Sequence, residues 1–78
     1  MKRFDLRRAE NVMERLQRII IDDVDQGEAA IFIYEVAENF ALVQESADLI
    51  KKLDFELINS LKYNEVDWTI CVRKPIRR

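Results

Sequence analysis

The chain of 78 residues contains no histidine and only one cysteine, one glycine and one proline. Without histidine, neither a Ser-His-Asp nor a Cys-His catalytic arrangement can form, and most structural zinc sites are excluded. A single cysteine rules out an intrachain disulfide and nearly excludes a cysteine-based zinc site. These absences remove the commonest nucleophilic and zinc-dependent enzymes, and we predict neither a metal ion nor a cofactor.

Long hydrophobic runs are also missing, because every apolar stretch is too short to cross a bilayer. No apolar stretch follows the opening Met-Lys-Arg, so we expect no signal peptide, no membrane association and a cytoplasmic protein. The composition, 49% hydrophobic and 36% charged, suits a folded globule. A chain of this length builds one core, which predicts a single domain over residues 1–78.

Hydrophobic periodicity divides the chain into six elements. Apolar runs and alternating residues predict strands over 3–6, 29–34, 55–61 and 66–73. Three- and four-residue spacing predicts amphipathic helices over 9–20 and 38–53, the second capped by Asn39. The order β-α-β-α-β-β, with right-handed crossovers, places both helices on one face of a four-stranded mixed sheet. The predicted fold class is α/β, an α+β two-layer sandwich.

Four short motifs follow one another along the chain. They are Leu6-Arg7 at the end of the first strand, Val12-Met13 in the first helix, Gly27-Glu28 before an apolar strand, and the closing run Trp68-Thr69-Ile70-Cys71-Val72-Arg73-Lys74. In this order they resemble the TusA/SirA/YedF family of small sulfur-carrier proteins. The resemblance covers most of the chain and implies the same β-α-β-α-β-β fold.

In that family, a cysteine in a Cys-Pro-x-Pro motif between the first strand and the first helix accepts a sulfur atom and passes it on. The corresponding stretch here is Arg8-Ala9-Glu10-Asn11, with Arg8 in place of the cysteine. The resemblance therefore implies a divergent member that keeps the fold and lacks the sulfur-transfer cysteine. Cys71 is then the one candidate sulfur acceptor, the alternative being a small apolar residue packed within a strand.

Charge is segregated along the chain, since residues 19–50 carry eight acidic side chains and no basic one. In the family's sheet order the last strand runs antiparallel to the first, which would gather the cations of both ends into a basic patch: Lys2, Arg3, Arg73, Lys74, Arg77 and Arg78. Such patches bind RNA or acidic protein tails, or stay solvated. Arg7 and Arg8, beside the amide groups that open the first helix, form a candidate anion-binding site or a solvated surface pair.

The strand over 29–34 is apolar on both of its sides, with Ile31 and Ile33 on one and Phe32 and Tyr34 on the other. Only one pair can face the helices. The other pair is expected to form, with Thr69 and Cys71, an exposed apolar patch of the kind that marks interaction surfaces. The alternative is partial cover by long side chains such as that of Arg73.

We therefore predict a non-catalytic binding or regulatory protein of TusA/SirA-like fold, which contacts a protein partner or a second copy of itself through the open sheet face. Two alternatives stay open. The chain is a sulfur-relay protein, or a docking partner in such a relay, that uses Cys71; or it binds RNA through the terminal basic patch.

Overall fold

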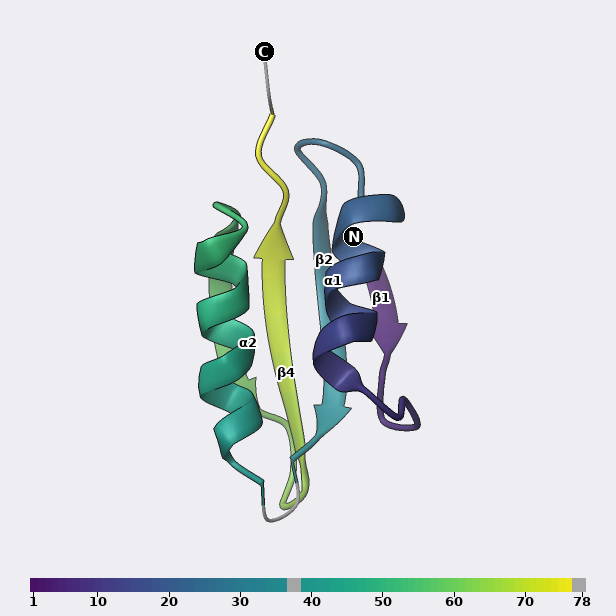
Figure 1. Cartoon of the computed structure of the whole chain (residues 1–78), viewed down its shortest axis with the longest axis vertical. Coiled ribbons are helices and arrows are strands. Elements are labelled where there is room, and N and C mark those ends of the chain that lie inside the picture. The colour runs from purple at the N-terminus through teal and green to yellow at the C-terminus, as the bar shows by residue number, and fades with distance from the viewer. Residues whose placement is uncertain (37–38, 77–78) are drawn as a thin grey trace.

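The structure, a computed structural model, describes residues 1–36 and 39–76 (Figure 1). It contains the six predicted elements in the predicted order. The strands are β1 (Lys2–Asp5), β2 (Ala29–Glu35), β3 (Glu56–Lys62) and β4 (Asp67–Arg73), and the helices are α1 (Val12–Asp22) and α2 (Ala41–Lys52). The predicted α+β fold class is confirmed. Neither of these helices is long and apolar enough to cross a membrane.

The four strands form one sheet in the order β1-β2-β4-β3. β1 runs parallel to β2, and β4 runs antiparallel to both of its neighbours, so the sheet is mixed as predicted. β2 and β4 occupy the centre and β1 and β3 the edges. The central place of β2 agrees with its apolar run, since a central strand is shielded from water along both of its edges.

Both helices cover the same face of the sheet (Figure 1). Asn11 starts α1 by accepting a hydrogen bond at its Oδ1 from the backbone N–H of Glu14, at 3.1 Å. The helix then turns Leu16 and Ile20 towards the sheet, where both are buried. They belong to the same core as Ile50 of α2 and the residues of β2 and β4 that face the helices. The core therefore occupies one side of the sheet.

Two local features differ from the sequence-based expectation. α2 begins at Ala41 with Phe40 in the N-cap position, and Asn39 does not cap it with its side chain. In β3, a simple alternation would place Leu57 and Asn59 on one side. A bulge between these two residues shifts the register, so that Leu57 pairs with Val72 and Asn59 with Cys71. The extra residue of a bulge reverses the alternation beyond it, which sends Asn59 to the face opposite Leu57.

Candidate docking surface on the open sheet face

The sheet face opposite the helices is the open sheet face. The strand register places Ile31 of β2 beside Cys71 of β4, and Ile33 beside Thr69. Because successive side chains of a strand alternate between faces, these four side chains share one side of the sheet. Ile31, Ile33 and Thr69 are half-buried. Neither α1 nor α2 lies over this face (Figure 1).

Phe32 and Tyr34 do not belong to this surface, which corrects the wider set of interface residues expected from the sequence. Both side chains are 0% exposed. The Phe32 ring stacks on Phe4 with centroids 5.2 Å apart. The Tyr34 hydroxyl lies 2.7 Å from Oγ of Ser46 in α2. They point to the helices because that layer buries larger side chains, leaving the two isoleucines for the open face.

Cys71 is also wrong as an exposed patch residue, because only 4% of it is exposed. It lies in a central strand between Ile31 and Asn59 of the neighbouring strands. Next along β4, Arg73 forms an ion pair with Glu56 at 3.8 Å and donates to the carbonyl oxygen of Gly27 at 3.2 Å. This end of the open face is therefore closed, and a sulfur donor could reach Cys71 only after the strands part.

The other end of the open face is hollowed, with a cavity of about 490 Å³ that we call the sheet hollow. Ile31, Ile33 and Thr69 line it from the two central strands. Tyr63, which follows β3 and is 64% exposed, lines one side. The opposite side is polar and comes from the N-terminal strand and the loop that follows it: Arg3, Asp5 and Arg7.

Arg7 is fixed by two carboxylates. Its guanidinium donates to Asp5 at 2.7 Å and 3.0 Å, and its backbone N–H donates to the same carboxylate at 3.0 Å. Its Nη1 also lies 3.6 Å from Oδ2 of Asp67, a buried residue of β4. The side-chain hydrogen bonds from Arg7, followed by its backbone N–H, lower the pKa of Asp5 to about 2. The same pairing raises the pKa of Arg7.

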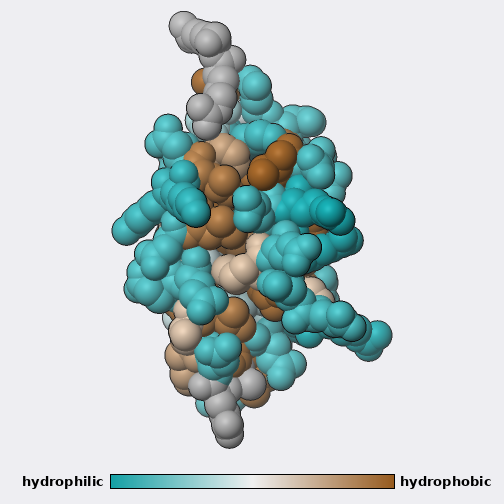
Figure 2. All heavy atoms as spheres, in the orientation of Figure 1, coloured by the Kyte–Doolittle hydropathy of each residue, from teal (hydrophilic) through white to brown (hydrophobic). Residues whose placement is uncertain are grey.

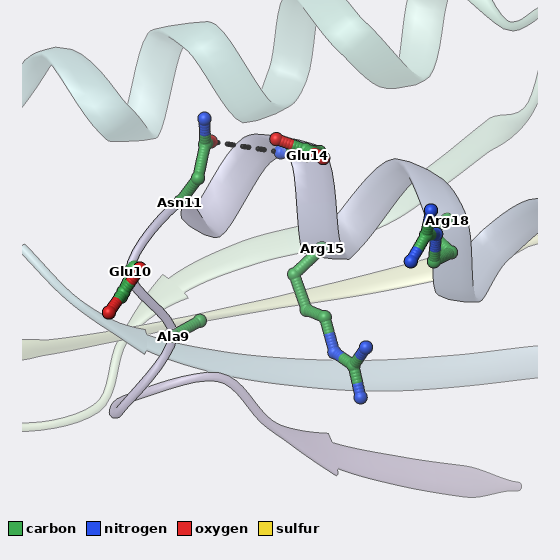
Figure 3. Close-up of a pocket in the computed structure, with 6 residues that line it drawn as sticks. All are labelled: Ala9, Glu10, Asn11, Glu14, Arg15 and Arg18. Atoms are coloured by element: carbon green, nitrogen blue, oxygen red, sulfur yellow. Dashed lines mark hydrogen bonds between the residues drawn. The ribbon is translucent and has the colours of Figure 1, made fainter.

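The expected anion-binding pair of Arg7 and Arg8 is thus divided. Arg7 already binds carboxylates, and Arg8 is exposed beside it. The first amides of α1 have their own acceptor, because Asn11 binds the N–H of Glu14 (Figure 3). Figure 3 also shows Arg15 extending away from this cap, along a shallow hollow of about 340 Å³. These residues do not converge on a common anion.

The terminal basic patch is largely occupied by contacts within the chain. Lys2 donates to the carbonyl oxygen of Asp23 at 2.6 Å, and Lys74 donates to those of Ile21 and Val24 at 2.8 and 3.0 Å. Arg73 is paired as described above, and Arg3 lies at the sheet hollow. Arg77 and Arg78 lie outside the described residues. The RNA-binding alternative therefore loses most of the free cations on which it was based.

A second apolar recess lies on the helix side. Figure 2 shows hydrophobic side chains along the seam between hydrophilic surfaces of the two helices. Met13 and Leu49 line a hollow of about 500 Å³ there, together with the acidic residues Glu14, Glu45 and Asp48. Both apolar residues pack against the core. The seam is therefore the outer edge of the helix packing, whereas the sheet hollow has no second layer of the described residues above it.

Comparison with known proteins gives the family. Residues 1–74 match the model of a family described as the E subunit of a "putative NADH-ubiquinone oxidoreductase". The chain belongs to this family. It is also similar to a protein of Helicobacter pylori, HP1264, whose solution structure has 44% sequence identity and a TM-score of 0.66, with 97% of this chain and 100% of that protein covered. A search of proteins with curated functions found no match. The resemblance to the TusA/SirA/YedF family is not tested by these comparisons and stays a prediction.

The family's description raises the question of redox groups. An iron–sulfur cluster is held by four protein ligands, mostly cysteine thiolates, and this chain has one cysteine and no histidine. A dinucleotide-binding turn needs several glycines, and this chain has one. Among residues 1–36 and 39–76, no three His, Cys, Asp or Glu side chains converge as metal ligands. These residues do not fit either group, and we derive no chemical step through them.

Sequence reasoning identifies the two isoleucines and Thr69 but misses the rim of the sheet hollow. It assigns Tyr63 to a turn and Arg3 to the basic patch. The signal that could have found them is the register. Arg3 pairs with Ile31 and Asp5 with Ile33, so both extend the surface begun by the isoleucines.

Proposed function

We propose that the protein is a non-catalytic subunit that docks, through the sheet hollow, onto a protein of an NADH-ubiquinone oxidoreductase. Two observations support the proposal: the description of the family to which the chain belongs, and an apolar hollow on a sheet face that the described residues leave uncovered. The second observation carries it. A half-buried apolar surface of this kind loses further contact with water when a partner covers it.

A binding role agrees with the chemistry of the residues. The hollow contains no nucleophile, and its carboxylate and one of its two guanidinium groups neutralise each other. Cys71, the alternative sulfur acceptor, is buried. We propose a cytoplasmic location for the contact, because the single cysteine is a free thiol, the form that a reducing compartment maintains.

The experiment uses an affinity-tagged copy of the full chain and detergent-solubilised membranes of the source organism. We expect the tagged protein to retain NADH-dependent ubiquinone reductase activity on the resin. Ile33→Asp places a charge in the hollow and should release this activity, as should Tyr63→Asp at its exposed rim. The matched control is Ile21→Asp, since Ile21 lies on α1 and is 48% exposed on the other side of the molecule.

Circular dichroism and urea unfolding must first show that each variant is folded, because Ile33 is half-buried. The more exposed Tyr63→Asp keeps the test valid if Ile33→Asp does not fold. Activity that passes through the resin with the unmodified chain would refute the proposal. Equal retention by Tyr63→Asp and Ile21→Asp would show that the contact uses a different surface.

A further inference from the structure

We infer that the sheet hollow recognises an apolar side chain followed closely by a carboxylate in the partner protein, and that Arg3 binds the carboxylate. This inference rests on the proposed function and specifies the chemistry of the partner. The occupant is a short segment of a polypeptide, with an aromatic or leucine side chain as the anchor.

The floor of the hollow selects the apolar part. Ile31 and Ile33 from β2 stand next to Thr69 from β4, and none of them carries a charge. The Tyr63 ring forms a wall against which a second ring can pack. A volume of about 490 Å³ lies in the size range of ligand pockets. One large side chain fits with room for the adjoining backbone, and interfaces commonly gain most of their affinity from a few such anchors.

The charges on the rim select the second part. Arg7 is committed, because two carboxylates face it and Asp5 binds it with two short hydrogen bonds. Arg3 lines the same hollow and is exposed, but within residues 1–36 and 39–76 it has no hydrogen bond or ion pair through its side chain. An uncommitted guanidinium beside an apolar surface is suited to a bidentate bond with a carboxylate.

The two parts lie close together, because Arg3 pairs directly with Ile31 across the β1–β2 ladder. Neighbouring side chains on one face of a sheet are about 5 Å apart. A carboxylate bound to Arg3 and an anchor on the isoleucines therefore belong to adjacent or nearly adjacent residues. A C-terminal phenylalanine, which carries both groups in one residue, is the smallest probe that satisfies this geometry.

The test is an NMR titration of the labelled full chain with the tripeptide acetyl-Gly-Leu-Phe, used once with a free C-terminal carboxylate and once as the C-terminal amide. We expect the acid to shift the amide signals of Ile31, Ile33 and Thr69. The amide form should bind about tenfold more weakly, the effect of one lost charged hydrogen bond. Arg3→Met should weaken the acid by the same factor and leave the amide unchanged. The matched control Arg18→Met removes a cation from α1 and should change neither.

Equal affinity for the two peptides, shifts confined to another surface, or no saturable shifts would each overturn the inference. So would concentration-dependent shifts of the same signals without peptide, since these would identify a second copy of the protein as the occupant. Failure here is separable from failure of the proposed function. If Tyr63→Asp releases the oxidoreductase while the peptides do not bind, docking stands and the assigned partner chemistry is wrong.

Discussion

The buried pair formed by Tyr34 and Ser46 makes a sharp test of which face of β2 is structural. Their hydroxyl oxygens are 2.7 Å apart, both residues are 0% exposed, and Ser46 also donates to the carbonyl oxygen of Val43 at 2.9 Å. The two ends of this bond are therefore not equivalent. Removing the tyrosine hydroxyl leaves Ser46 with a partner, whereas removing the serine hydroxyl leaves a buried tyrosine hydroxyl with none.

The magnitudes follow from this asymmetry. Tyr34→Phe should lower the free energy of unfolding by about 0.5–1.5 kcal/mol, the net value of one hydrogen bond. Ser46→Ala should cost about 1–3 kcal/mol for the unsatisfied hydroxyl, offset by about 0.5 kcal/mol because alanine favours the helix more than serine does. In the double variant the stranded hydroxyl is gone, so its loss should be smaller than the sum of the single losses by about 1 kcal/mol.

Urea unfolding measures all four proteins, and each kcal/mol should also lower Tm by about 4–8 °C in a domain of this size. Additive losses, or a Ser46→Ala variant more stable than the parent, would refute the reasoning. The pH dependence gives a second check. Burial raises the pKa of Tyr34 above its usual 10.0, so this stabilisation is complete below pH 10 and is lost as pH rises through the folded-state value. Tyr34→Phe should remove that alkaline loss.

Three further predictions concern other parts of the fold. Lys74→Met removes two hydrogen bonds to carbonyl groups at the end of α1, and it should cost about 1 kcal/mol in urea unfolding and speed amide exchange there; unchanged exchange would contradict this role. Because Arg7 lowers the pKa of Asp5 to about 2, the stability from this pair is present above pH 3.8 and is lost as pH falls through 2; Asp5→Asn should flatten the acid-unfolding profile in that window, and an unchanged profile would count against the pair. Cys71 should react with a thiol reagent only at the rate of local opening, and rapid labelling of the native protein would show that β4 opens readily and would revive the sulfur-relay alternative.

The order of elements could be predicted because each carries its own period. Leu16, Ile19 and Ile20 recur at helical spacing, and the run over 29–34 is too short and too β-branched for a helix. The limits of such reasoning are local. Nothing in the residues of β3 announces a bulge, because the bulge depends on how the strand pairs with β4, so simple alternation places Asn59 on the wrong side.

The site could be predicted only in part, for the same reason. Alternation along β2 divides Ile31 and Ile33 from Phe32 and Tyr34, but it does not tell which pair faces the helices. That choice follows from packing, because the Tyr34 hydroxyl finds Ser46 only on the helix side. The burial of Cys71 likewise depends on its neighbours in both adjoining strands rather than on its own surroundings in the sequence.

The segregated charge of the chain is explained by the fold rather than by a nucleic acid. The end of α1 leads into the acidic stretch of the sequence, and no basic residue lies in the last turn of this helix. The cations that complement its carbonyl groups come instead from the two ends of the chain: Lys2 from β1 and Lys74 from the residue after β4. Lys2 also pairs with Glu28 at 3.4 Å. Since a helix end attracts positive charge and Lys74 bonds backbone oxygen atoms, both lysines hold α1 against the sheet. Their removal should loosen this end of the fold, and Arg3 is the described cation of the predicted patch that is left to meet a partner.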